Sequence, residues 1–308
     1  MISIFLTILI GAFWGGSFVA IQAVVAQFPP LVAVFWRIAL ATVVMAPIVC
    51  VKRKPLWPQH SKRLAMVSGA LAMGIPWCLL FWAEQHVNGA LGAIMNATVP
   101  VFVLLLSPLY HPKAVTRQQW LGVGMAFMGI VVVFMPGLQT GGASNAWAVA
   151  ALVGMAIAYA NGLLFAQRFL RGLAPTTASL WQGVGGASFV AVVALSSGYS
   201  LWNPDLILEP IPRWGILYLA VFSTAIANII LLWLLQQKGS VTTSLVTFLI
   251  PLFSIIIEWM YFGTEPSRTT WAGTVMVLMG LYIVQFWRQR KKVRMDAPIL
   301  SSASGDET

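Results

Sequence analysis

Three ionisable side chains stand in long apolar stretches of this chain, where charged residues are otherwise absent. Arg37 is the only basic residue inside such a stretch, and Glu84 and Glu258 are the only carboxylates in one or at its edge. A charge in an apolar segment is costly to bury and is a functional candidate by default. A planar guanidinium can hold a carboxylate through two hydrogen bonds, and an intramembrane carboxyl group can relay a proton.

Three interpretations of Arg37 stay open. It lies roughly 10 Å along a helix from the start of its segment. It can snorkel to the headgroups on its long stem, pair with Glu84 at the same level, or face a cavity and hold an anionic group. The Trp-Arg pair at 36–37 recurs as Trp181-Gln182, which favours an inward-facing position over snorkelling. We place the ion pair slightly ahead of anion recognition.

Uncharged polar and aromatic side chains lie at helical spacing in several other apolar stretches. One Asn in such a stretch is often only an interhelical hydrogen bond, but five stretches with polar stripes favour a shared cavity. We predict a substrate-binding cavity lined, with Arg37, by Gln22, Trp77, Asn96, Tyr159, Asn161, Gln182, Asn228 and Thr247. For proton coupling Glu258 is preferred, because Glu84 fits a headgroup contact about as well.

Composition determines the class of protein. Of 308 residues, 59% are hydrophobic and 8% are charged, whereas soluble domains carry about 25% charged residues. Ten stretches are about as long as a membrane-spanning helix requires: 3–26, 30–51, 64–84, 88–110, 118–135, 146–166, 176–197, 214–236, 241–262 and 269–287. The stretches are too long and continuous for a β-barrel, so we predict an all-α integral membrane protein with ten transmembrane helices.

The net charge of +10 reports topology and does not indicate nucleic acid. Fifteen of the 18 Lys and Arg residues fall in alternate loops and in the tail after the tenth segment, against Arg213 and Arg268 on the other side. The positive-inside rule then places both termini in the cytoplasm. Residues 1–26 resemble a signal peptide weakly, but they lack a basic start and their apolar run is long, so we expect a retained first helix.

The chain repeats itself. A shift of 145 residues aligns Gln22 with Gln167 and Trp36 with Trp181, and later a shift of 151 aligns Trp82 with Trp233. Such matches indicate a duplication. We predict five-helix repeats at 4–135 and 147–287 and a polar cytoplasmic tail at 288–308. Because five is odd, the second repeat must be inverted relative to the first, as in many secondary transporters.

Proline and glycine mark irregular points in these helices. Gly74 and Pro76 predict a kink in the third segment. Pro100 and its repeat partner Pro251 interrupt the fourth and ninth segments, and paired interruptions of this kind point to a transport site. The fifth and tenth segments carry glycines among apolar residues, so we expect peripheral helices or a homodimer contact there.

The run WGGSFVAIQ…FPPLVAVFWRIAL at 14–40, with the two five-segment halves, resembles the EamA type of the drug/metabolite transporter superfamily. The resemblance covers about 4–135 and 147–287. The family's Gly-Glu pair is nearly matched by Gly263-Thr264-Glu265-Pro266, but His111-Pro112-Lys113 stands at the corresponding place in the first half. The resemblance implies export of small metabolites such as amino acids or their derivatives, with uptake of a vitamin- or nucleotide-like solute as the alternative.

Other functional classes fit less well. The apolar segments hold no Asp, and the chain has no HExxH, GxSxG or phosphate-binding glycine motif. We therefore expect neither an enzyme nor a metal or other cofactor, and no direct use of ATP. A receptor or membrane assembly subunit without a transported solute remains a second alternative. The expected partners are a small-molecule substrate and the lipid bilayer of the inner membrane.

Overall fold

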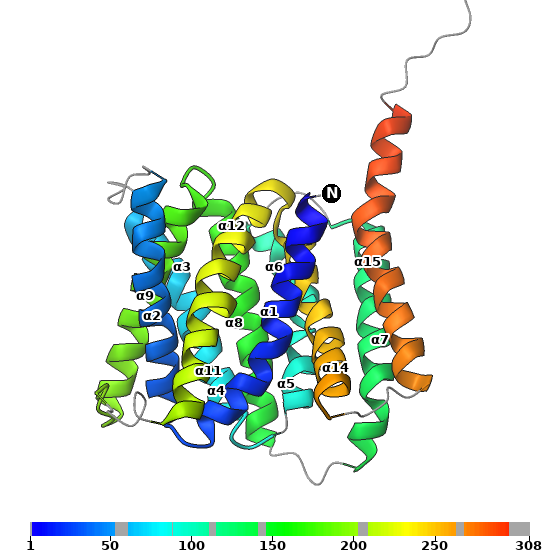
Figure 1. The fold of residues 1–308 in the computed structure, drawn as a ribbon. Coiled ribbons are helices and arrows are strands. Elements are labelled where there is room, and N and C mark those ends of the chain that lie inside the picture. The colour runs from blue at the N-terminus through cyan, green and yellow to red at the C-terminus, as the bar shows by residue number, and fades with distance from the viewer. Residues whose placement is uncertain are drawn as a thin grey trace, which may run out of the picture.

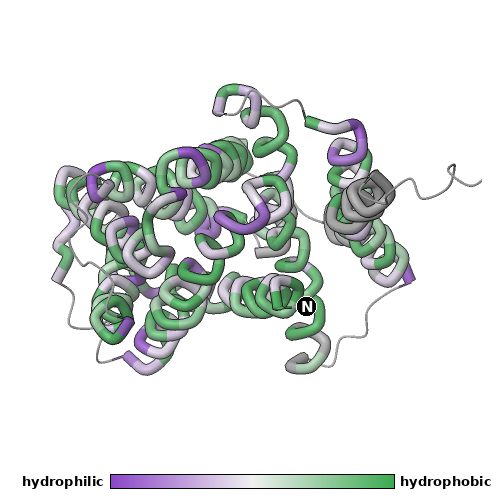
Figure 2. The backbone as a smooth tube through the Cα atoms, turned by 90° about the horizontal axis from the view of Figure 1, so that it is seen from above, coloured by the Kyte–Doolittle hydropathy of each residue, from purple (hydrophilic) through white to green (hydrophobic). Residues whose placement is uncertain are grey.

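The computed structural model describes residues 2–52, 61–87, 89–110, 115–140, 146–202, 209–262 and 268–295, and every regular element in these ranges is helical. Seven helical segments are long and apolar enough to cross a membrane. The predicted all-α class is confirmed, and helices also lie over each of the ten predicted stretches. Figure 2 shows apolar residues predominating along most of the tube.

The described residues of the first half form eight helical elements. They are α1 (Ile2–Val25), α2 (Pro30–Val51), α3 (Lys62–Gly69), η1 (Ala70–Gly74), α4 (Ile75–Ala83), α5 (Gly89–Asn96), α6 (Val99–Tyr110) and α7 (Arg117–Thr140). The second half contains α8 (Ala146–Phe169), α9 (Pro175–Ser196), α11 (Pro210–Ala220), η2 (Val221–Ile226), α12 (Ala227–Lys238), α13 (Ser240–Ser244), η3 (Leu245–Phe248), α14 (Leu249–Phe262) and α15 (Arg268–Met295).

Prolines account for several of these boundaries. Pro30 and Pro175 begin α2 and α9, where a missing N–H costs nothing. Pro76 removes the hydrogen bond to Ala72, which lies in the π-helical turn η1. In the same way, Pro100 cannot bond to Asn96, where α5 ends. The interruption predicted near Pro100 is therefore present, and a π-helical turn lies directly before Pro76, where a kink is predicted.

The irregular turns recur at equivalent places in the two halves. The π-helical turn η1 begins at Ala70, and the π-helical turn η2 begins 151 residues later at Val221. Likewise the break between α5 and α6 is matched by the 3₁₀ turn η3, just before Pro251. The offset is the one that the sequence repeat predicts.

Helices of one half pack against helices of the other. The second helices, α2 and α9, contact each other; α2 also packs on α11 and η2, while α9 packs on α3 and η1. Similarly α1 contacts α11 and α14, and α8 contacts α4 and α6. In Figure 1, α2, α3 and α9 lie at one side of the bundle and α7 and α15 at the other, and α1 begins at the end of the bundle where α15 finishes.

The glycines of α7 and α15 bring these two helices together. A Cβ added at Gly280 would lie 2.5 Å from the carbonyl oxygen of Gly122, and one at Gly129 would lie 2.7 Å from that of Gly273. Such close approach requires glycine. These residues therefore pack within the chain, and the homodimer contact stays a prediction about the remaining faces of the pair.

Candidate functional site

A small cavity lies where the two halves meet. It is lined by Trp14, Ser17, Phe18, Ile21, Arg37, Pro76, Trp77, Leu80, Asn96, Met155, Tyr159 and Ile250. The centre of a water molecule has about 40 Å³ of free space there, and one water needs roughly 10–15 Å³ on this measure. The cavity admits a few waters, so a metabolite requires it to widen.

Arg37 forms one wall of the cavity and is held from two sides. Its Nε donates a hydrogen bond to Thr224 Oγ1 at 2.9 Å, and its Nη2 donates to Ser223 Oγ at 3.3 Å. Its Cζ lies 3.9 Å from the centre of the Trp77 ring, a cation–π distance. Both hydroxyls belong to η2 and Trp77 to α4, so the two halves position the guanidinium together.

These contacts decide between the interpretations of Arg37. The side chain is only 3% exposed, so it does not snorkel. Within the described part of the chain it forms no ion pair with Glu84, and neither Glu84 carboxyl oxygen has a hydrogen-bond partner. The ion pair placed first above is therefore wrong as a direct contact: hydroxyls and an aromatic ring hold the guanidinium, which keeps unused N–H donors.

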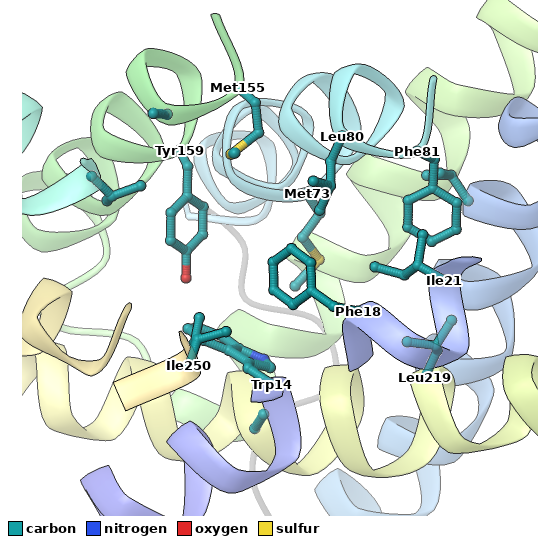
Figure 3. Packing of buried hydrophobic residues seen from close by; sticks show 14 of the residues in the cluster. Trp14, Phe18, Ile21, Met73, Leu80, Phe81, Met155, Tyr159, Leu219 and Ile250 are labelled. Carbon is teal, nitrogen blue, oxygen red and sulfur yellow. The ribbon is translucent and has the colours of Figure 1, made fainter. Parts of the chain in front are cut away.

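Tyr159 and Trp14 face each other across the cavity. Their ring centres are 6.1 Å apart with an interplanar angle of 72°, an edge-to-face pair. The indole N–H of Trp14 donates to the carbonyl oxygen of Ser223 at 2.8 Å, but the buried Tyr159 hydroxyl has no partner among the described residues. Figure 3 shows this hydroxyl pointing into the space between Trp14 and Ile250.

Glu84 is buried at the edge of the cavity. It is 6% exposed, so it does not reach the headgroups. A Cβ added at Gly92 would meet both Glu84 Oε1 and Phe18 Cε1 at 3.2 Å, which places the carboxyl group beside a cavity-lining ring. A buried carboxyl group without a partner is costly, and such a group is a candidate for function.

Gln182 and Asn228 belong to a separate polar cluster. Gln182 Nε2 donates to Ser68 Oγ at 2.8 Å, and Gln182 Oε1 accepts from Asn228 Nδ2 at 2.9 Å. The same Asn228 nitrogen donates to Ser179 Oγ at 2.8 Å. None of these residues lines the cavity. They satisfy one another and join α9 to α3 and α12.

The remaining predicted residues lie elsewhere. Gln22 is exposed near the end of α1. Asn161 accepts from Tyr110 Oη at 3.1 Å and donates to the Ile157 carbonyl. Thr247, in η3, is fully buried and donates to the carbonyl oxygen of Ser244 at the end of α13. The Glu258 side chain lies outside the described residues. Of the nine predicted lining residues, Arg37, Trp77, Asn96 and Tyr159 therefore meet at the cavity.

Sequence reasoning missed part of the cavity wall. Ser17, Phe18 and Ile21 line it from α1, and none of them is among the predicted lining residues. Trp14 could have been identified as a lining residue from the sequence, because it aligns with Tyr159 at the shift of 145 residues. Two repeats related by a twofold axis bring aligned residues together at that axis, and these two rings are in contact.

Comparisons with known proteins agree with this architecture. The sequence model of the EamA-like transporter family matches residues 1–135 and 146–286. An uncharacterized transporter of Archaeoglobus fulgidus is 25% identical over 88% of this chain and 94% of its own length. Protein PecM of Dickeya dadantii is 26% identical over 91% and 92%.

Two further matches concern the membrane and the fold. The uncharacterized inner membrane transporter YedA of Escherichia coli is 23% identical over 95% of this chain and 94% of its own length. A crystal structure of another protein superposes with a TM-score of 0.77 at 12% identity, covering 94% of this chain and 98% of the other, which shows a shared fold. This chain is a membrane protein, and it belongs to the EamA-like transporter family.

Proposed function

We propose that this protein is a secondary transporter that moves a small anionic or zwitterionic metabolite by alternating access. The observation that carries the proposal is the cavity between the halves, where Arg37 keeps unused donors and the Tyr159 hydroxyl has no partner among the described residues. Buried polar groups are normally satisfied. A bound solute with a carboxylate would supply the missing acceptors, with Trp14 and Trp77 as apolar walls.

The mechanism needs two halves that rock about this cavity, and we propose ten membrane-spanning helices in two inverted five-helix repeats. Three features support the repeats. The π-helical turns η1 and η2 lie at equivalent places. The second helix of each half, α2 or α9, packs on the third segment of the other half, and Trp14 contacts Tyr159, the residue with which it aligns. With the basic loops on one side, both termini would lie in the cytoplasm.

Glu84 is our candidate for proton coupling. Its carboxyl group is buried beside Phe18 without a hydrogen-bond partner among the described residues, and it is close enough to Arg37 for their charges to interact. A solute carboxylate arriving at Arg37 would offset the guanidinium charge felt by Glu84 and favour the protonated carboxyl group, which links solute binding to proton uptake. Glu258 stays a second candidate.

We propose export of amino acids or their derivatives across the inner membrane, with uptake of a vitamin- or nucleotide-like solute as the alternative. The name of the YedA relative supports the inner membrane. The test is metabolite profiling of medium and cells with and without the gene. A compound enriched in the medium of producing cells supports export, and one enriched inside supports uptake. Unchanged profiles in both would favour a non-transporting assembly subunit.

A further inference from the structure

Two pairs of glutamines occupy equivalent positions in the two halves. Gln22 aligns with Gln167 at the shift of 145 residues, and Gln85 aligns with Gln236 at the shift of 151. We call the end of the bundle where α8 finishes the α8 end, and the end where α1 finishes the α1 end. Gln167 and Gln236 lie at the α8 end, whereas Gln22 and Gln85 lie at the α1 end.

At the α8 end the glutamines tie neighbouring helices together. Gln236 Nε2, on α12, donates to the carbonyl oxygens of Leu170 at 3.2 Å and Leu173 at 2.8 Å, in the connection from α8 to α9. Gln167 Oε1, on α8, accepts from the backbone N–H of Ser240 at 2.9 Å, where α13 begins. Both glutamines are at least partly buried. These three hydrogen bonds close the α8 end, and we refer to them as the α8 latch.

At the α1 end the groups equivalent to Gln236 and its two carbonyl partners are present, but within the described residues they are not hydrogen-bonded. Val25 and Phe28 align with Leu170 and Leu173, and Gly89 begins α5 as Ser240 begins α13. Yet Gln22 and Gln85 are both exposed, and the Gln85 side chain has no hydrogen bond to Val25, Phe28 or any other residue in the described part of the chain. Residues 84–87 form turns after α4, whereas the equivalent residues 235–238 continue α12 as helix.

The cavity lies toward the end that lacks the hydrogen bonds. Phe18, Ile21 and Leu80 line it, and each lies in the half of its helix nearer to the α1 end. Their partners at the α8 end, Leu163, Ala166 and Leu231, are buried and do not line it. Both sets of residues are buried, but the cavity lies on the side where Gln85 is not bonded.

We propose that Gln22 and Gln85 form the same latch at the α1 end when the transporter closes there. Gln85 then donates to the carbonyl oxygens of Val25 and Phe28, Gln22 accepts from the N–H of Gly89, and residues 84–87 extend α4. The α8 latch breaks in that state. The structure therefore holds the α8 latch formed, while among the described residues the Gln85 bonds of its counterpart are not formed. The proposal rests on the alternating-access function proposed above.

The test measures which end of the cavity is open when one latch is removed. Methionine replaces glutamine with a side chain of similar length that lacks the amide donor and acceptor. Gln236→Met and Gln85→Met are made separately and together, in a background with Cys50→Ala and Cys78→Ala. A single reporter, Ile21→Cys or its partner Ala166→Cys, is added. The proteins are placed in lipid nanodiscs, which leave both ends open to solvent, and the rate of reaction with a charged methanethiosulfonate reagent is measured.

The two variants should act in opposite directions. Gln236→Met should slow the reaction of Ile21→Cys and speed that of Ala166→Cys, and Gln85→Met should do the reverse. Each hydrogen bond is worth about a fivefold change in the ratio of the two rates. The double variant should restore the ratio of the parent protein. A purely structural role for either glutamine would not produce opposite shifts.

Two outcomes overturn the proposal in different ways. If both reporters react but the variants leave the ratio unchanged, or shift it in the same direction, the latch is wrong while alternating access survives. If Ala166→Cys is unreactive in every background, there is no state open at the α8 end, and the proposed function fails with the latch. Gln22→Met and Gln167→Met provide an independent pair, with the same opposite shifts expected, if either first variant does not fold.

Discussion

Arg37 and Gln182 are equivalent in sequence, so changing each tests whether the cavity recognises a carboxylate. In Arg37→Gln the guanidinium that faces the cavity is lost, together with its bonds to Ser223 and Thr224. A hydrogen bond to a charged group contributes about 1.5–3 kcal/mol. Affinity for a carboxylate solute should therefore fall about 10- to 150-fold. Loss of the two internal bonds is partly offset by removal of a buried charge. We therefore expect the free energy of unfolding to change by less than the free energy of carboxylate binding.

Gln182→Met is the matched control, because this residue is equally buried but lies off the cavity. It loses its bonds to Ser68 and Asn228, each worth about 1 kcal/mol, and leaves buried partners unsatisfied at about 1–3 kcal/mol. We expect destabilisation by about 2–4 kcal/mol with little change in solute preference.

The assay compares amino acids with the amines that lack only the carboxylate, by binding to purified protein in nanodiscs. The parent protein and Gln182→Met should prefer the acid, and Arg37→Gln should lose this preference. Equal preference in the parent protein and Arg37→Gln, at matched folding, would refute carboxylate recognition by Arg37.

Three further substitutions, two of them paired with a control substitution, test separate contacts. Tyr159→Phe removes a hydroxyl that has no partner among the described residues, so thermal stability should not fall. The control Tyr218→Phe loses a 2.8 Å hydrogen bond to the Phe13 carbonyl and should lose about 1 kcal/mol of stability. Equal losses of thermal stability in both variants would contradict an unbonded Tyr159 hydroxyl. Glu84→Gln should abolish proton-driven accumulation in vesicles but retain solute exchange, and accumulation at the parental rate would remove Glu84 from coupling. Gly280→Leu should separate α7 from α15 and cost at least about 1–3 kcal/mol, because its Cβ would meet the Gly122 carbonyl; Gly124→Leu, with nothing within 4 Å, should be tolerated.

Topology is predicted from charge alone. A cytoplasm-active reporter fused after Arg294 should be active and a periplasm-active one silent. The reverse pattern would contradict the inverted arrangement of the halves together with the cytoplasmic placement of both termini.

The fold was largely predictable because membrane helices depend on local composition. Apolar length located the helices, and Pro30 and Pro76 marked a helix start and an irregular turn. The shift of 145 residues also aligned Trp14 with Tyr159, which meet at the cavity. Periodicity could not distinguish a polar residue that lines a cavity from one that joins helices, so Arg37 and Gln182 seemed equivalent although only Arg37 faces the cavity.

The sequence could not predict which groups the Arg37 guanidinium contacts, and the reason is physical. Arg37 and Glu84 are opposite charges at a similar depth, and in a uniform apolar medium they would pair. The packing of η2 against α2 presents Ser223 and Thr224 to the guanidinium instead, and that packing depends on contacts between the halves. The different states of Gln85 and Gln236 are likewise a property of conformation, since the two residues are identical.

Solute counterflow in proteoliposomes tests the central claim most directly. Vesicles containing the purified protein are loaded with an unlabelled compound that metabolite profiling identifies, and the labelled compound is added outside with all ion gradients absent. An alternating-access transporter predicts a transient accumulation of label above equilibrium, which Arg37→Gln should abolish. Simple equilibration without an overshoot would indicate a channel, and no entry beyond that of empty vesicles would contradict transport of that compound.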